Sequence, residues 1–194
     1  MSMKKTFFGA LPDGKPVDCY TIENQNGMRA EILTYGGTLN KLYVPDQNGV
    51  FADVLIGFDT LEGHLNHSDY QGMLVGRYAN RIADGAFVLN GEEYHVTKNE
   101  NQITCLHGGG EFSHAVWDAQ PVGEDALRLS YESPEGAQGF PGRVTAHAVY
   151  TLTQENVLRI DYYAVSDRDT ILNLTNHAYF NPVSYTHLRA HETV

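Results

Sequence analysis

Apolar and polar side chains alternate along several stretches of this chain, and this period of two constrains the fold more than any other feature. In residues 144–152 and again in residues 158–164, every second side chain is apolar or aromatic. Residues 127–132 repeat the pattern over a shorter length. A period of two places successive side chains on opposite faces of a β-strand, whereas an amphipathic helix repeats about every 3.6 residues. These stretches therefore predict half-buried strands, and the two longer ones predict a hairpin around the polar turn at residues 154–156.

A second hairpin is predicted in residues 87–96 by the pair Asn90-Gly91. Both positions of a tight two-residue turn require a positive φ, which Asn and Gly adopt most easily. That register places Phe87 opposite Tyr94. Only residues 60–67 have a pattern compatible with a short helix. An antiparallel all-β fold follows, and the periodicity alone leaves both a sandwich and a barrel open.

The composition is that of one globular domain with an acidic surface. The chain has 194 residues, 42% of them hydrophobic, which is enough for a single core. Lys and Arg total 13 against 24 Asp and Glu, so the formal charge is 13 − 24 = −11. Such a chain repels phosphate backbones and anionic lipid surfaces, so we expect no nucleic acid partner and no membrane. Cys19 and Cys105 form no paired motif, and no apolar run is long enough to span a bilayer, so we expect a soluble, cytoplasmic protein without disulfides.

Three segments place polar side chains where a β core would have apolar ones. The first is Gly-Arg-Tyr-Ala-Asn-Arg-Ile at residues 76–82, with Arg77, Asn80 and Arg81. The rigid fork of donors on an arginine suits it to hold sugar hydroxyls or a carboxylate. The structural alternative is a pair of arginines whose stems lie along a strand edge while their charged ends reach solvent.

The second segment is Cys-Leu-His-Gly-Gly-Gly at residues 105–110. Glycines next to His107 would let the backbone approach a ligand closely. A phosphate-binding loop is a competing hypothesis, but no Gly-Lys-Ser/Thr follows and no helix is predicted to start there. A glycine-rich turn with an incidental histidine is equally compatible with the residue types.

The third segment, residues 170–181, is predicted to be one strand with two different faces. The apolar face would carry Leu172, Leu174, Ala178 and Phe180, and the polar face Asn173, Thr175, His177 and Tyr179. Sugar sites are built in this way, because aromatic rings meet C–H surfaces and polar groups meet hydroxyls. A histidine also titrates near neutrality and is able to give or take a proton. The alternative is a histidine with ordinary partners on a solvated sheet face.

Metal binding and nucleophilic catalysis have little support in the sequence. His64 and His67 are spaced HxxH, and His187 and His191 are spaced HxxxH, but neither pair has a nearby set of Cys, Asp or Glu in ligand-like order. A serine nucleophile in a G-x-S-x-G turn is also missing from the sequence. We therefore predict no metal site.

In order and spacing, three motifs together resemble those of the aldose 1-epimerase family: the segment at residues 76–82, Leu-His-Gly-Gly at residues 106–109, and Asn-His-Ala-Tyr-Phe-Asn at residues 176–181. The resemblance implies a large antiparallel β-sandwich that interconverts the α and β anomers of free aldohexoses such as galactose and glucose, without a metal or an organic cofactor. It makes His177 the general acid at the ring oxygen. His107 and Arg81 would hold the sugar hydroxyls and the developing charge, with Asn80 beside them.

Two departures from the family pattern concern the end of the chain. The family's general base is a glutamate well downstream, beyond the last residue here, and Glu192 lies too close to His177 to be assigned that role. The family usually has Leu where this chain has Pro182. We therefore expect residues 1–181 to be a partial epimerase domain, incomplete at the C-terminus and inactive by itself, and residues 182–194 to be a non-native tail.

Two other functions remain open at this point. One is a non-catalytic carbohydrate-binding module with the same fold. The other is a relative that acts on phosphorylated hexoses, which would call for more basic residues around the site than an acidic chain suggests. In each of these cases the expected ligand is a small sugar.

Overall fold

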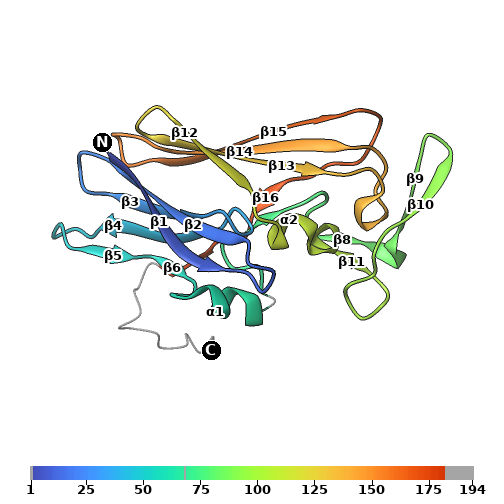
Figure 1. Cartoon of the computed structure of the whole chain (residues 1–194), viewed down its shortest axis with the longest axis horizontal. Coiled ribbons are helices and arrows are strands. Elements are labelled where there is room, and N and C mark those ends of the chain that lie inside the picture. The colour runs from blue at the N-terminus through green and yellow to red at the C-terminus, as the bar shows by residue number, and fades with distance from the viewer. Residues whose placement is uncertain (1, 68, 182–194) are drawn as a thin grey trace.

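Two antiparallel sheets packed face to face form the framework of the chain (Figure 1). The computed structural model describes residues 2–67 and 69–181. The first sheet has the order β1-β2-β3-β4-β5 and the second β12-β13-β14-β15. The strands of the first sheet are β1 (Ser2–Ala10), β2 (Pro16–Glu23), β3 (Arg29–Leu33), β4 (Leu39–Pro45) and β5 (Phe51–Asp53). Those of the second are β12 (Asp118–Val122), β13 (Ala126–Ser133), β14 (Val144–Leu152) and β15 (Leu158–Ser166).

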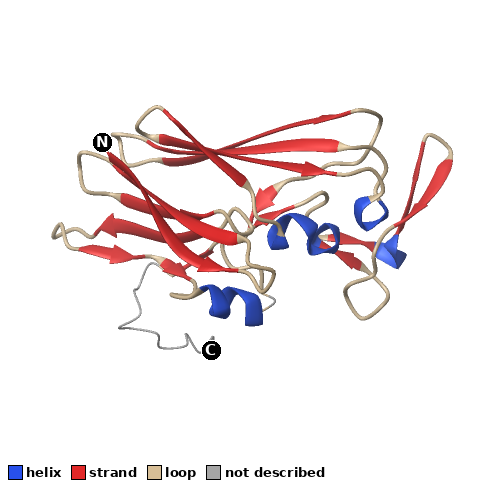
Figure 2. Cartoon of the chain, in the orientation of Figure 1, coloured by secondary structure: helices blue, strands red, loops and turns tan. Residues whose placement is uncertain are grey.

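Shorter elements connect the sheets and carry the functional segments. Four pairs of short strands are β6 (Leu55–Ile56) with β17 (Tyr179–Phe180), β7 (Leu74–Val75) with β16 (Thr175–Asn176), β8 (Arg81–Ile82) with β11 (Cys105–Leu106), and β9 (Ala86–Leu89) with β10 (Glu92–His95). The helices are short, α1 (Leu61–Asn66) and α2 (Glu111–His114), with three single turns of 3-10 helix (Figure 2). No helix in the part of the chain that the structure describes has the length and apolar character to cross a membrane.

The core lies between the two sheets, as the alternation predicts. In β14 every second residue from Val144 to Leu152 is fully buried, and the residues between are only partly so. Ile22 and Ile32 of the first sheet belong to the same buried cluster as Leu129 and Tyr150 of the second. Burial of each such side chain stabilises the fold by about 1.5–3 kcal/mol. Because neither sheet closes on itself, the predicted all-β fold is confirmed as a sandwich.

Both predicted hairpins are confirmed. β14 and β15 pair antiparallel around the turn at residues 154–156, and β9 and β10 pair around Asn90-Gly91, both with positive φ. Phe87 lies opposite Tyr94 with the ring centroids 5.5 Å apart. The inward side chains of β15 are only half-buried, because β15 is the last strand of its sheet among the described residues.

The prediction of one continuous strand at residues 170–181 is wrong. The segment pairs with β7 as β16, breaks at His177, and then pairs with β6 as β17. At the break the backbone N–H of His177 donates to the carbonyl of Met73, and the Asn176 side chain accepts from the N–H of Ala178. The apolar face is also less buried than expected, since Phe180 is 61% exposed.

The helix prediction is correct in one place and incomplete in another. Residues 60–67 contain α1, whose first turn is capped by the Thr60 hydroxyl accepting from the N–H of Gly63. The expectation that no helix starts after the glycine run is wrong, because α2 begins at Glu111. Gly110 has a φ of 81°, which lets the chain turn sharply into this helix.

A buried arginine joins the first functional segment to the second sheet. Arg77 has no exposed surface, and all five of its N–H groups donate to oxygen atoms of residues 133–142. The acceptors are the Ser133 hydroxyl and the carbonyls of Ser133, Pro134, Pro141 and Gly142, at 2.6–3.3 Å. The structural alternative of an arginine reaching solvent is therefore wrong for Arg77, which is a structural residue of the interior.

We predict that Arg77→Met lowers the free energy of unfolding by about 3–5 kcal/mol, because the buried acceptors lose their donors. Arg159→Met is the matched control, since Arg159 forms an exposed ion pair with Asp161 and its loss should cost at most about 1 kcal/mol. Urea unfolding followed by circular dichroism measures both. A loss below about 1 kcal/mol for Arg77→Met would show that its hydrogen bonds contribute little net stability.

A second buried polar group, His64, is held neutral inside the fold. It is 2% exposed, its Nε2 lies 2.9 Å from Oδ1 of Asn40, and its ring meets Phe58 edge-on. Burial lowers the pKa of His64 to about 4, against a weaker opposing effect of a hydrogen bond to the backbone of Phe58. In the unfolded chain the pKa of the same side chain is about 6.5. Acid therefore favours the unfolded state, because only that state binds the proton.

We predict that His64 contributes on the order of 2–3 kcal/mol to the loss of stability between about pH 7 and about pH 4.5. His64→Gln should show a correspondingly smaller loss over this range. Equal pH dependence in wild type and His64→Gln would contradict a depressed pKa. Chemical unfolding at a series of pH values gives the comparison.

Candidate functional site

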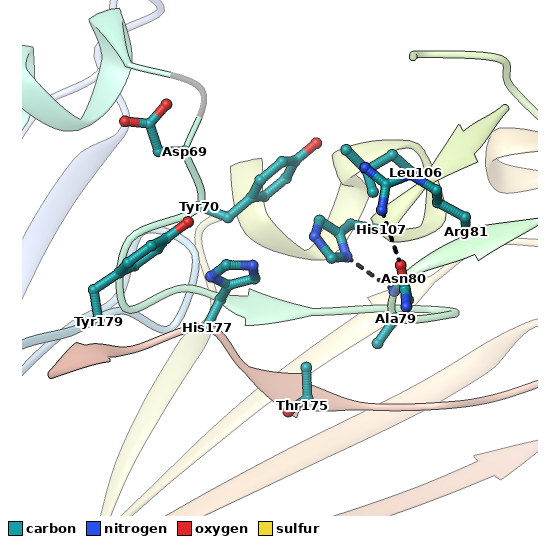
Figure 3. Close-up of a pocket in the computed structure, with 10 residues that line it drawn as sticks. All are labelled: Asp69, Tyr70, Ala79, Asn80, Arg81, Leu106, His107, Thr175, His177 and Tyr179. Carbon is teal, nitrogen blue, oxygen red and sulfur yellow. Dashed lines mark hydrogen bonds between the residues drawn. The ribbon is translucent and has the colours of Figure 1, made fainter. Parts of the chain in front are cut away.

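The three polar segments meet at one cavity of about 610 Å³ (Figure 3). This volume lies within the range of small-molecule sites, about 300–1,000 Å³. The cavity is lined by Asp69, Tyr70, Ala79, Asn80, Arg81, Leu106, His107, Thr175, His177 and Tyr179. Asp69 and Tyr179 lie at one end, Asn80 and Arg81 at the other, and the two histidines between them. Residues more than a hundred positions apart in the sequence, such as Asp69 and Tyr179, are thus brought to one surface.

His107 is fixed by two reciprocal hydrogen bonds with Asn80. Its backbone N–H donates to the Asn80 carbonyl at 2.9 Å, and its ring Nδ1 accepts from the Asn80 backbone N–H at 3.0 Å. Both residues have a positive φ, 68° for Asn80 and 52° for His107. Since Nδ1 is an acceptor, the neutral ring carries its proton on Nε2. His107 therefore has one N–H left to donate.

The surroundings of His107 favour this neutral form. Burial lowers its pKa most, followed by the neighbouring His177 and Arg81, while Glu100 acts in the opposite direction. The ring of His177 meets that of His107 nearly at right angles with centroids 5.1 Å apart. Tyr70 meets His107 edge-on at 4.7 Å. Two imidazole rings and an aromatic wall thus face the same space.

His177 lies at the break between β16 and β17, where its backbone is bonded to the loop before β7. Its N–H donates to Met73 at 2.9 Å, and its carbonyl accepts from Gly72 at 3.0 Å. Tyr179, two positions on, has its ring 5.1 Å from that of His177. The interrupted strand therefore still presents Thr175, His177 and Tyr179 to the cavity, as the expected polar face required.

The loop before β11 holds the other end of the cavity. The Asn99 side chain accepts from the N–H of Leu106 at 2.7 Å and donates to its carbonyl at 2.9 Å. The Glu100 carboxylate accepts from Arg81 Nε at 2.7 Å and Nη2 at 2.6 Å. Arg81 also donates from Nη1 to the Asn80 side chain at 3.3 Å. The ion pair raises the pKa of Arg81 and lowers that of Glu100, so both remain charged near neutrality.

Close backbone packing joins the glycine segment to the arginine segment. At Gly108, with a φ of 63°, an added Cβ would overlap the carbonyl oxygen of Gly76 and the amide nitrogen of Arg77. The sequence suggested that glycines here would let a ligand approach. At Gly108 the close approach is instead to the protein's own backbone, and it places His107 beside Asn80.

We predict that Gly108→Ala destabilises the fold more than Gly49→Ala does. Both positions have positive φ, but a Cβ at Gly49 meets nothing within 4 Å. The control therefore isolates the backbone cost of about 1 kcal/mol, and Gly108→Ala adds a steric cost of about 1–3 kcal/mol. Thermal unfolding measures the difference, and equal losses for the two variants would contradict the close packing.

The structure brings together the candidate residues Asn80, Arg81, His107 and His177, whereas Asn173 lies outside the cavity lining and pairs with the segment at residues 77–79. Sequence reasoning missed Asp69 and Tyr70, because the loop after α1 has no recognisable pattern. It also missed Asn99 and Glu100, although these two polar residues lie only a few positions before His107 in the sequence.

The pair His64 and His67 does not form a metal centre in the described part of the chain. His64 and His67 both contact Phe58, and His64 is buried away from the cavity. No group of three or more His, Cys, Asp or Glu within residues 2–67 and 69–181 is arranged to hold a metal ion. His187, His191 and Glu192 lie outside the described residues.

Comparison with known proteins identifies the family. A family model described as aldose 1-epimerase matches residues 18–193. An aldose 1-epimerase from Haemophilus influenzae is 42% identical over 179 residues, which cover 92% of this chain and 52% of that protein. A galactose mutarotase from Rattus norvegicus is 38% identical over 183 residues, covering 93% of this chain and 52% of that protein. The chain thus spans about half the length of the curated relatives it matches.

Solved structures agree with this result. The galactose 1-epimerase from Lactobacillus acidophilus superposes with a TM-score of 0.81 and 30% identity, over 93% of this chain and 53% of that one. A GalM/aldose epimerase homologue from C. elegans gives a TM-score of 0.78 and 34% identity, over 83% and 50%. Since the family match covers most of the residues and the superposed folds agree, the chain belongs to the aldose 1-epimerase family.

Proposed function

We propose that the protein interconverts the α and β anomers of free aldohexoses such as galactose and glucose, and that this chain supplies the sugar-binding cavity and the general acid. The observation that carries the proposal is the meeting of His107, His177, Asn80 and Arg81 around one cavity. These residues come from three separate segments, and each of them offers a group that binds or protonates a sugar oxygen.

In the proposed reaction His177 is the general acid. A base removes the proton from the C1 hydroxyl while protonated His177 gives a proton to the ring oxygen, so the C1–O5 bond breaks and an open-chain aldehyde forms. Rotation about C1–C2 and closure on the other face, with the protons returned, give the second anomer. No net proton or electron is consumed, so no cofactor is required. A positioned acid or base of this kind typically contributes about 10²–10⁴ in rate.

The neighbours of His177 are suited to hold the sugar during ring opening. Neutral His107 keeps one ring N–H to donate, and Arg81 adds a fixed positive charge near the oxygens where negative charge develops. Tyr70 and Tyr179 supply aromatic surface for the C–H faces of the ring. The cavity thus combines the two kinds of contact that a pyranose needs.

The general base is proposed to be a residue other than those given a role above. Asp69 is the one carboxylate that lines the cavity among the described residues, and it lies at the far end from Arg81. The relatives are about twice as long as the matched region. The base is proposed to lie in a region of the protein that corresponds to the unmatched half of these relatives. We therefore propose that the chain by itself binds sugar without turnover.

We predict saturable binding of galactose or glucose to this chain, with the NMR signals of His107 and His177 shifted by the sugar. Arg81→Met should weaken binding about tenfold, because the charged hydrogen bonds to the sugar are lost. Arg159→Met, which removes an exposed arginine of β15, should leave the affinity unchanged.

Polarimetry of freshly dissolved α-D-glucose tests turnover in the same samples. No acceleration over buffer is expected from this chain. Acceleration that is lost in His177→Gln would mean that the base lies within the chain, and Asp69→Asn would then test the carboxylate in the cavity. Absence of any sugar binding would contradict the proposed function of the chain.

A further inference from the structure

One edge of the Arg81 guanidinium already forms hydrogen bonds within the protein. The guanidinium has five N–H groups. The one on Nε and one of the two on Nη2 donate side-on to the Glu100 carboxylate, and one of the two on Nη1 donates to the Asn80 side chain. One N–H therefore remains on each terminal nitrogen. The Arg81 side chain is 56% exposed and lines the cavity, so these two groups are accessible to a ligand.

Glu100 itself stands on a fixed backbone. Its N–H donates to the carbonyl of Thr104 and its carbonyl accepts from the N–H of Thr104, both at 3.1 Å. Next to it, Asn99 bonds both main-chain groups of Leu106, the residue before His107. Leu106 in turn pairs with Arg81 between β11 and β8. The carboxylate and the guanidinium are thus held on one small, mutually bonded unit.

We propose that Glu100 is a positioning residue for sugar binding: its carboxylate holds Arg81 side-on, so that the two remaining N–H groups point as a pair at two adjacent hydroxyl oxygens of the sugar. The inference rests on the proposed function. A free arginine side chain loses considerable rotamer freedom when it binds, and a residue already ordered by a partner loses less. The proposed effect of Glu100 is therefore on affinity, through pre-organisation.

The melting temperature is a poor measure of this role of Glu100, and the pKa of His107 is a better one. An ion pair whose arginine is mostly exposed contributes little to folding, so a Glu100 variant should melt within about 3 °C of wild type. The charged or titratable groups around His107 are His177, Tyr70, Arg81 and Glu100. Of these, the Glu100 carboxylate raises the pKa of His107. Its removal should let His107 titrate at lower pH.

The experiment compares wild type with Glu100→Gln, Glu100→Asp and the control Glu155→Gln, in the chain as it exists. Glu155 is exposed in the turn between β14 and β15, so its variant carries the same change of charge at a remote place. Galactose affinity is measured by calorimetry, and NMR follows the Nε–H signal of Arg81 and the titration of His107.

For Glu100→Gln we expect galactose affinity to fall about three- to tenfold, the equivalent of ordering one flexible side chain on binding. The Arg81 signal should shift and the pKa of His107 should fall. Glu100→Asp keeps the charge but shortens the side chain by one methylene, so its affinity should fall similarly while His107 titrates closer to wild type. Glu155→Gln should match wild type in all three measurements.

The outcomes separate this inference from the proposed function. Wild-type affinity in Glu100→Gln, or in Glu100→Asp, would overturn the positioning role and leave the sugar site in place. A wild-type chain that binds no sugar would overturn the proposed function and this inference with it.

Discussion

The buried guanidinium of Arg77 is the interaction on which the site depends. Its five hydrogen bonds tie residues 76–82 to the last residue of β13 and to the loop that follows it, and Gly108 packs directly on the peptide that joins Gly76 to Arg77. Asn80 and Arg81 follow a few residues after this anchor, and His107 comes immediately before Gly108. The two segments that carry these residues are therefore positioned by one buried charge and one close backbone contact, and a displacement of either changes the distance between Asn80 and His107.

Burying a charge so completely is costly unless its hydrogen bonds are all made. Burial lowers the pKa of Arg77, and the carboxylate of Glu111 acts in the opposite direction. Glu111 accepts from the hydroxyls of Ser133 and Tyr131, and Ser133 in turn accepts from Arg77. Glu111, in the first turn of α2, is thus a counterion linked to the arginine through the Ser133 hydroxyl. The phenol of Tyr131 stays protonated as a donor, since burial, with Glu111, raises its pKa to about 12. The short helix that the sequence did not predict has this structural role.

The parts of the fold that could be predicted are those specified by neighbouring residues. The alternation in β14 and the Asn90-Gly91 turn are local signals, and both are confirmed. The segment at residues 170–181 was predicted wrongly because its hydrogen-bond partners lie about a hundred positions earlier, around Met73 and Leu55. The role of Arg77 was missed for a similar reason, since four of its five acceptors are backbone carbonyls, which no side-chain pattern reveals. Motif resemblance found the histidines, but the loop with Asp69 and Tyr70 offered no motif.

The break at His177 shows how the core of the sandwich reaches the site. A regular strand would hold His177 by ladder hydrogen bonds, yet here its neighbour Asn176 turns its side chain inward and donates to the Gly72 carbonyl at 2.6 Å and to the Tyr150 hydroxyl at 3.2 Å. The Tyr150 hydroxyl itself donates to the carbonyl of Gly37 in the turn between β3 and β4. One chain of hydrogen bonds therefore links the turn between β3 and β4, Tyr150 of β14 and the backbone beside the proposed acid. Because a buried network of this kind tolerates little displacement, the orientation of His177 is determined by the packing of the two sheets as much as by its own segment.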